Sequence, residues 1–334
     1  MALRLIEVAI PRAQVDALSE LVSDIDIVHM RVSDGSESGG MAYFLIDSHE
    51  SESLSDLLVS RFGKEDGFRL IMIPVEATLP HVEAADEKEE LAKSGVRSGK
   101  LGPQRISREE LYEDIANAAR LSPVYIIMVG LSSIVAAVGL LRDDLAVIIG
   151  AMLIAPLLGP NVGMSLAVTL GDLDLGRRSI KAISAGVFTA AAVSVLIGLL
   201  FTVDPQAPQI VSRTQPQLTD IALALSAGVA GALAFTSGVP AVVVGVMVAV
   251  ALLPPLVVTG LLAGDGHAKP ALEALTLALL NVTCINLAAI GTFIAQKVSP
   301  RTWWEADRAS EATRRAAIGW MILLAIVLGL IFLL

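Results

Sequence analysis

The chain begins with short alternating segments and continues with long apolar ones. In the first 79 residues, apolar runs rich in Val, Ile and Leu predict four strands, at 3–10, 25–32, 41–47 and 67–75. Apolar residues at helical spacing predict two helices between them, at 11–23 and 53–63. The order βαββαβ is that of the ferredoxin-like split βαβ arrangement. We therefore expect residues 1–79 to form an α+β ferredoxin-like soluble domain.

Seven apolar stretches follow after residue 121. They lie at about 122–141, 145–170, 179–201, 218–237, 239–263, 271–296 and 315–334. Each has about 20 residues or more, which is the length that a helix needs to cross the hydrocarbon core of a bilayer. We therefore expect residues 122–334 to form a polytopic α-helical membrane domain of about seven helices.

Residues 80–121 join these two parts. The first part of this segment is polar and charged, which is typical of a linker. The remainder, 106–121, has an apolar face, and Ser107 with Glu110 three residues later forms a capping-box pattern. This amphipathic helix either lies on the membrane surface and couples the soluble domain to the bundle, or it extends the first membrane span.

The distribution of charge indicates an orientation. The chain is 54% hydrophobic, with a mean hydropathy of +0.70 and a net charge of −10. Residues 1–99 hold 9 Lys and Arg against 19 Asp and Glu, whereas residues 100–334 hold 15 of each. The acidic soluble part lacks a basic face, so we expect no nucleic-acid binding. Lys and Arg gather on one side of the spans, which predicts a multi-pass protein of the inner (cytoplasmic) membrane with a cytoplasmic N-terminal domain.

The membrane part contains an internal repeat. The segment 147–160 aligns without gaps on 242–255, at an offset of 95, and six of the fourteen aligned positions are identical. The pair Gly171-Asp172 recurs as Gly264-Asp265, at an offset of 93. We interpret these matches as two repeats of three helices, at about 122–201 and 218–296. Because each repeat has an odd number of spans, the second enters the membrane inverted.

Prolines and asparagines in the spans give the candidate substrate path. A proline lacks the amide hydrogen and disrupts the preceding helical turn, so it frees carbonyl groups at membrane depth. These prolines either kink packed helices or open a site, and their recurrence in both repeats favours the site. Asparagine amides offer donor and acceptor groups there. The expected path residues are Pro156, Gly159, Pro160, Asn161, Pro254, Pro255, Asn281 and Asn286.

Several kinds of chemistry are disfavoured. The middle of each span lacks Asp, Glu, His and Lys, which argues against a proton pump with a buried carboxylate. His29 and His49 have no Cys or paired His nearby, so we expect no metal site, and the single cysteine, Cys284, forms no intrachain disulfide. Nucleophile–base pairs, zinc-protease motifs and phosphate-binding glycine loops are missing. We therefore expect neither an enzyme nor a cofactor.

The motif at 147–160 carries a family resemblance. Together with Ser122, Tyr125, Gly139-Leu140-Leu141, Gly171-Asp172 and the Leu-Leu-Pro-Pro segment 252–255, it resembles the prokaryotic uncharacterised hydrophobic domain membrane proteins, domain of unknown function 389. The resemblance covers about 106–296. The resemblance implies a prokaryotic membrane protein and does not indicate a substrate.

Two functional hypotheses follow. The first is a transporter or channel for a small solute or ion, gated or assembled by the cytoplasmic domain. The alternative is a membrane-anchored sensor or scaffold, whose ferredoxin-like domain binds a small metabolite or nucleotide and which transports nothing. The expected partners are the lipid bilayer, a small-molecule ligand and further copies of the chain. Homo-oligomers are favoured by small-residue faces at Gly159-x-x-x-Gly163 and Gly260-x-x-x-Gly264.

Overall fold

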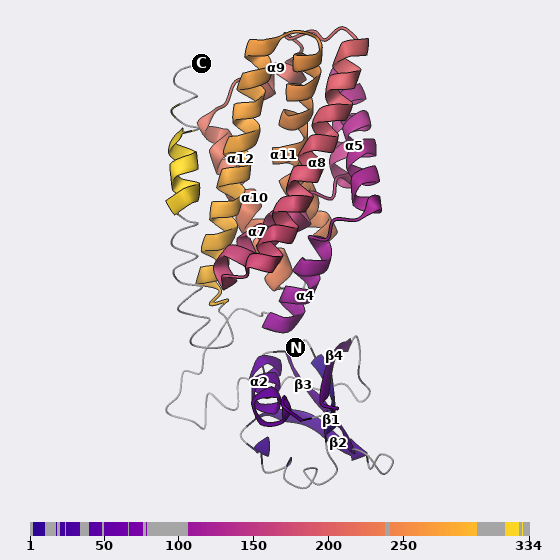
Figure 1. Cartoon of the computed structure of the whole chain (residues 1–334), viewed down its shortest axis with the longest axis vertical. Coiled ribbons are helices and arrows are strands. Elements are labelled where there is room, and N and C mark those ends of the chain that lie inside the picture. Colours follow the sequence, from indigo (N-terminus) through magenta and orange to yellow (C-terminus); the bar gives the residue numbers. More distant parts are fainter. Residues whose placement is uncertain are drawn as a thin grey trace. The chain divides into compact units, whose positions relative to one another are not determined.

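The computed structural model divides the chain into two compact units, Met1–Leu111 and Tyr112–Leu334, so the boundary lies inside helix α4 (Arg108–Ala118). The residues that it describes are 3–10, 18, 21–23, 25–33, 40–48, 50–65, 67–75, 78, 106–237, 241–298, 318–326 and 329. The ribbon is drawn in Figure 1.

The first unit contains a four-stranded antiparallel sheet in the order β2-β3-β1-β4. Its elements are β1 (Leu3–Ile10), β2 (Ile27–Ser33), β3 (Gly40–Asp47), α2 (Ser51–Phe62) and β4 (Arg69–Val75). The four predicted strands and the second predicted helix are confirmed, with ends that differ by no more than two residues. The first predicted helix, 11–23, lies outside the described residues except for Leu18 and 21–23.

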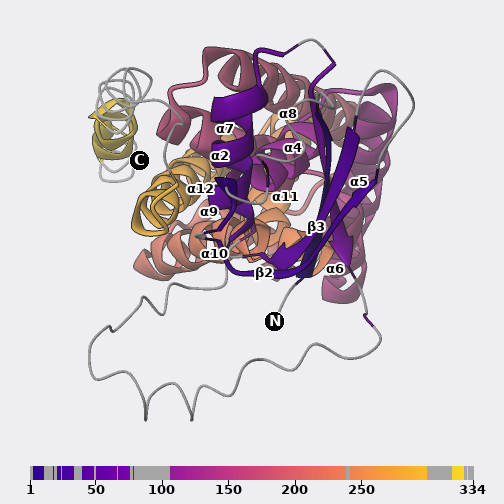
Figure 2. The ribbon, with the colours of Figure 1, turned by 90° about the horizontal axis from the view of Figure 1, so that it is seen from below.

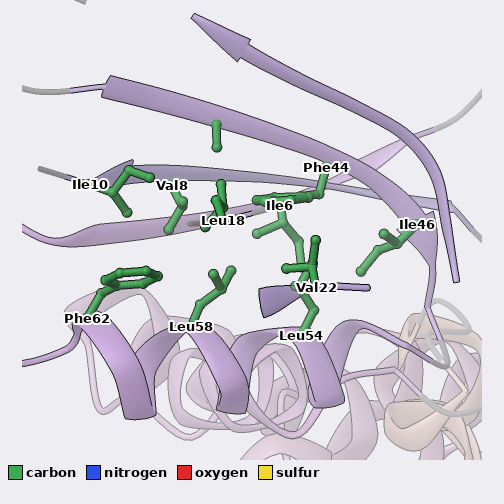
Figure 3. Packing of buried hydrophobic residues seen from close by; sticks show 11 residues of the cluster. Ile6, Val8, Ile10, Leu18, Val22, Phe44, Ile46, Leu54, Leu58 and Phe62 are labelled. Atoms are coloured by element: carbon green, nitrogen blue, oxygen red, sulfur yellow. The ribbon is translucent and has the colours of Figure 1, made fainter. Parts of the chain in front are cut away.

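The core of this unit follows from the period of two along its strands. Alternate residues of β1 and β3 are buried and face the helix α2, which presents Leu54, Leu58 and Phe62 at a spacing of four (Figure 3). Each such fully buried side chain contributes about 1.5–3 kcal/mol. The strand residues of the cluster are Ile6, Val8, Ile10, Ala42, Phe44 and Ile46, and Leu18 and Val22 complete it.

The last residues of this unit form the first turn of α4. The amide of Glu110 donates to Ser107 Oγ (3.2 Å), which is one half of the predicted capping box. The carboxylate of Glu110 instead accepts two hydrogen bonds from Arg4, at 2.9 and 3.0 Å. Arg108 pairs with Asp56 of α2 (3.1 Å). The bidentate Arg4–Glu110 pair and the single Arg108–Asp56 contact fix the turn against the sheet and α2.

The second unit is a helical bundle. Among the described residues, four helices are long and apolar enough to cross a membrane, and a bent helix pair makes a fifth. The chain is therefore mostly helical with a membrane-spanning composition. The helices are α5 (Pro123–Leu141), α6 (Leu145–Ile154), α7 (Leu158–Leu170), α8 (Leu173–Leu200), α9 (Pro208–Thr214), α10 (Leu218–Thr236), α11 (Ala241–Gly264) and α12 (Ala268–Ala295). Of the predicted last span, 315–334, only 318–326 and 329 are described.

The two proline motifs adopt different conformations. Helices α6 and α7 meet at a bend of 53°, and Ala155 between them is extended, with ψ 115°. Pro156 explains this conformation, because a proline disfavours helical geometry in the residue before it. In contrast, α11 continues as a helix through Pro254 and Pro255. Thus the first motif breaks its helix and the second does not.

Helix lengths in the bundle recur at a constant offset. Helices α5 and α10 both have 19 residues, α8 and α12 both have 28, and in each pair the first residues differ by 95. Helices α5–α8 form a first set and α10–α12 a second, and each set is preceded by a further helix, α4 and α9 respectively. Residues 112–118 of α4 lie at one end of the bundle and α9 lies at the other (Figure 1). Seen along the bundle, α11 lies in its middle (Figure 2).

Glycines with positive φ mark equivalent helix ends. Gly171 has φ 68° and Gly266 has φ 88°, and the amide of the residue after each donates to the carbonyl five residues earlier, at 2.9 and 2.8 Å. Both ends are therefore Schellman-type turns. The pairing of Gly171 with Gly264 that the sequence predicted is wrong by two residues, because the equivalent left-handed position, at the offset of 95, is Gly266.

The two small-residue faces pack inside the chain. A Cβ at Gly159 would overlap the carbonyl group of Ala118, and a Cβ at Gly260 would overlap the side chain of Ser194. These glycines thus permit close contact of α7 with the end of α4 and of α11 with α8. They no longer argue for a homo-oligomer. Helix α4 ends before Ser122, which caps α5 separately, so α4 is not an extension of the first span.

Candidate functional site

A buried polar cluster joins α7 to α12. Ser165 Oγ donates to Asn286 Oδ1 (2.9 Å), and Asn286 Nδ2 donates to Asn161 Oδ1 at a longer 3.4 Å. All three side chains are buried. Because unpaired polar groups are costly in an apolar interior, these mutual contacts are what allow the three residues to lie at this depth.

The same asparagine stabilises the helix break. Asn161 Nδ2 donates to the carbonyl of Leu157 (2.8 Å), which is the residue that precedes α7. On the other side of the break, Ser132 Oγ of α5 donates to the carbonyl of Ala151 (2.7 Å). Side chains thus bond backbone carbonyls on both sides of the break, as irregular backbone at membrane depth requires.

Asn281 has a separate role at the second motif. Its Nδ2 donates to the carbonyl of Ala251 (2.7 Å), and this carbonyl is the one that Pro255, lacking an amide hydrogen, leaves without its helical donor. The asparagine therefore replaces the missing bond, which explains why α11 remains helical there. Its Oδ1 is buried and has no hydrogen-bond partner among the described residues.

A cavity of about 80 Å³ lies between these elements. Its wall is mostly hydrocarbon, and none of its described lining residues is Asp, Glu, His, Lys or Arg. Asn161 and Tyr125 are the two lining residues with polar side chains, and the Tyr125 hydroxyl already donates to the carbonyl of Ala182 (3.0 Å). The lining residues are Tyr125, Leu157, Asn161, Ile183, Val187, Leu252, Leu256, Leu275, Ala278, Leu279 and Val282.

The cavity lining repeats with the helices. Eight of these eleven residues form four pairs that differ by 95 in number: Leu157 with Leu252, Asn161 with Leu256, Ile183 with Ala278, and Val187 with Val282. Equivalent positions of the two helix sets therefore meet around one cavity. In the pair Asn161 and Leu256, one residue has a polar side chain and the other an apolar one, whereas both residues of each other pair are apolar.

The rim of the cavity is apolar and exposed. Val187 on α8 has 40% of its surface exposed and Leu279 on α12 has 41%. Both helices are among those long and apolar enough to cross a membrane. The cavity is thus partly open, and hydrocarbon side chains line its opening.

The predicted path residues separate into three groups. Asn161 and Asn286 contact each other, and Asn161 lines the cavity. Pro156 lies in the helix break, while Gly159 and Pro160 are in the first turn of α7. Pro254, Pro255 and Asn281 form the α11 arrangement described above. The sequence analysis missed the apolar lining, although the offset of 95, applied beyond the proline motif, pairs those residues too.

A second polar contact lies outside the spans. The Tyr112 hydroxyl donates to Asp172 Oδ2 (2.7 Å), and Asp172 also caps α8 by accepting from the amides of Asp174 and Leu175. Burial and this hydrogen bond raise the pKa of Tyr112 to about 12. Burial opposes ionisation of Asp172, but hydrogen bonds from the Leu175 amide and Tyr112 outweigh it, so the pKa of Asp172 is lowered.

The sequence analysis considered His29 and His49 as metal ligands and expected no site at either. His29 is exposed on β2, and His49 lies outside the described residues. Over the part of the chain that the structure describes, three or more His, Cys, Asp or Glu side chains nowhere gather as a metal ion would require.

The apolar helices and the buried polar contacts between them define a membrane protein. The chain belongs to the family with a domain of unknown function (DUF389), whose model matches residues 152–287, a range that contains all eight predicted path residues. It is 36% identical over 331 residues to the uncharacterized protein MJ0678 of Methanocaldococcus jannaschii, and the match covers 99% of each chain. This confirms the family resemblance. No solved structure matches the chain.

Proposed function

We propose that this protein is a transporter or channel for a small solute or ion, and that the cavity is its substrate site. The observation that carries the proposal is the pairing of eight lining residues at the offset of 95. Sites of secondary transporters lie at the interface of two repeats, next to discontinuous helices. Two features of the cavity support the proposal: its lining comes from positions that differ by 95, and the break between α6 and α7 borders it at Leu157.

The proposal includes a 3+3 inverted repeat, with spans at about 122–201 and 218–296 and a final helix at 315–334, which gives seven spans. The broken pair α6–α7 counts as one span and corresponds to α11. The placement of α9 and residues 112–118 of α4 at opposite ends of the bundle supports the inversion (Figure 1). The Lys and Arg distribution supports an inner-membrane protein with a cytoplasmic N-terminal domain.

We further propose that the N-terminal unit is a ferredoxin-like domain. Its strand order, with β1 and β3 in the centre and all neighbours antiparallel, supports this fold. The unit gates or assembles the bundle, and the protein is a homo-oligomer. Among the described strands β4 lies at an edge of the sheet, and its Ile71 and Ile73, exposed on the face opposite α2, offer a surface for a second copy.

The difference between the two motifs supports a transport cycle. One repeat has a broken helix and the other a continuous one, so the same motif adopts two conformations in one chain. In transporters with inverted repeats, one half rocks against the other around a fixed site. We propose that exchanging the two conformations between the repeats opens the cavity first to one side of the membrane and then to the other.

Cysteine accessibility tests this proposal without knowledge of the substrate. In a Cys284→Ala background, Leu157→Cys and Leu252→Cys place thiols at equivalent cavity positions. In sealed, oriented vesicles, we expect a membrane-impermeant thiol reagent to modify both from either face. Leu153→Cys on the exposed surface of α6 is the control and should not react. A folded protein whose cavity thiols react from neither face would contradict transport and favour the sensor or scaffold alternative.

A further inference from the structure

We propose that the cavity binds an uncharged amphipathic molecule that enters from the bilayer, with its hydrocarbon part against the leucines and one hydrogen-bonding group at Asn161. This inference rests on the proposed function, since it names the substrate class of that site. Three observations support it: the composition of the wall, the bonding of Asn161, and the position of the rim.

The composition of the wall disfavours an ion. Ten of the eleven lining residues present hydrocarbon, or in the case of Tyr125 a hydroxyl that is bonded to another helix. Moving an unpaired charge into such surroundings costs several kcal/mol even after the protein relaxes. The described lining has no charged side chain to offset that cost. A neutral molecule that buries apolar surface has no such penalty.

Asn161 can bond one polar group of such a molecule. Its amide has two N–H donors and two acceptor lone pairs. One N–H bonds the Leu157 carbonyl at 2.8 Å, whereas the contact from Asn286 to the oxygen is 3.4 Å, at the outer limit for a hydrogen bond. A hydroxyl in the cavity could therefore donate to this oxygen at a shorter distance. At the equivalent position, Leu256 presents only hydrocarbon.

The rim indicates the route. Val187 and Leu279 are exposed on helices with membrane-spanning composition, so their exposed surface faces lipid chains rather than water. The cavity of about 80 Å³ is several times the ~10–15 Å³ that one water needs on the same measure. It holds the polar end and a few carbons of a ligand, while the rest of a longer chain extends through the opening between α8 and α12.

Photolabelling with an octanol probe tests the inference. The full-length protein in liposomes is irradiated with a 1-octanol analogue that carries an aliphatic diazirine, and the labelled peptides are mapped by mass spectrometry. We expect adducts around Leu157, Leu256 and Val282. Excess 1-octanol should reduce labelling, whereas octyltrimethylammonium, of equal chain length but charged, should not. Equal competition by the cation, or equal labelling of all membrane-exposed helix surfaces, would overturn the inference.

Two variants sharpen this test. Leu279→Trp fills the rim and should lower labelling about fivefold, whereas Leu272→Trp, which is on the same helix, 43% exposed and away from the cavity, should leave it unchanged. Asn161→Leu should weaken competition by 1-octanol about tenfold, the factor that one net hydrogen bond gives. It should leave competition by n-octane unchanged. Equal labelling of Leu279→Trp and wild type would contradict the site.

The results distinguish this inference from the proposed function. If the thiols at Leu157→Cys and Leu252→Cys react from both faces and octanol does not label the cavity, transport stands and the substrate class is wrong. If octanol labels the cavity and neither thiol reacts from any face, the site binds an amphipathic molecule without transporting it, and the proposed function is wrong.

Discussion

The pairing of Asn281 with the carbonyl of Ala251 makes a double-mutant prediction. In Pro255→Ala, the new amide at position 255 donates to this carbonyl in the ordinary helical pattern, so the Asn281 side chain becomes redundant. Asn281→Leu should therefore destabilise the wild type and have little effect in the Pro255→Ala background. The two substitutions are coupled because both act on the same carbonyl oxygen.

The expected coupling is about 1 kcal/mol. A buried group left without a partner costs about 1–3 kcal/mol, and side-chain hydrogen bonds measured between membrane helices average about 0.6 and reach about 1.7 kcal/mol. The Oδ1 of Asn281, which has no hydrogen-bond partner within the described part of the chain, lowers the cost further, because Asn281→Leu removes that buried oxygen as well. Unfolding in mixed micelles with increasing SDS, followed by circular dichroism, measures the four proteins of the cycle.

Pro254 provides a matched control. Its missing amide frees the carbonyl of Val250, one residue earlier, whereas the structure bonds Asn281 to Ala251. Pro254→Ala and Asn281→Leu should therefore add without coupling, within about 0.5 kcal/mol. If the Pro255 cycle were equally additive, Asn281 would not be the replacement donor, and the explanation for the continuous α11 would be wrong.

Three further predictions concern other contacts. Gly159→Ala should lower the thermal stability of the bundle because its Cβ overlaps Ala118, whereas Gly150→Ala, with open space around it, should not; equal melting temperatures would contradict this packing. The pKa of Asp172 is lower in the folded protein than the ~3.9 of an unfolded aspartate, so its carboxylate stabilises the fold at pH values above ~3.9. This stabilisation is lost as the pH falls through the folded pKa. Asp172→Asn should therefore reduce the pH dependence of the unfolding free energy between these two pKa values. Ile71→Lys on the exposed face of β4 should shift the protein towards monomer in light scattering, and an unchanged mass would exclude that surface as the contact.

Sequence patterns predicted the first unit well because apolar and polar residues alternate along its strands. Residues such as Ile6, Val8 and Ile10 point to one face, and this period fixes both the strand and its buried side. The register of the strands involves long-range pairing, which the alternation within one strand does not specify. Of the predicted capping box, only the bond from the Glu110 amide to Ser107 forms. The sequence could not show that Arg4 would bind the carboxylate of Glu110 instead.

The candidate site was predicted in its polar part and missed in its apolar part. Asn161 and Asn286 stand out in apolar spans, since an amide there needs a partner. Leucines of the cavity have no such signature, because the same residues form any membrane helix surface. Asn281 looked like a member of the same group, but its role depends on which helix faces the carbonyl that Pro255 frees.

Residue identity gave a wrong alignment of the proposed repeats at one point. The pairing of Gly171-Asp172 with Gly264-Asp265 matched two letters at an offset of 93. The left-handed conformation and its hydrogen bonds instead belong to Gly266. For the proposed repeats, backbone conformation is therefore a better guide to alignment here than a matching dipeptide, because a positive φ is a physical requirement that glycine meets.

The orientation of the two halves is the claim that all the functional proposals share. Val124 and Thr219 differ by 95 and are exposed in the first turns of α5 and α10. In sealed, oriented vesicles of the Cys284→Ala protein, an impermeant maleimide should modify Val124→Cys only from the cytoplasmic face and Thr219→Cys only from the opposite face. If both thiols react from the same face, the halves are not inverted, and the site at their interface cannot work as proposed.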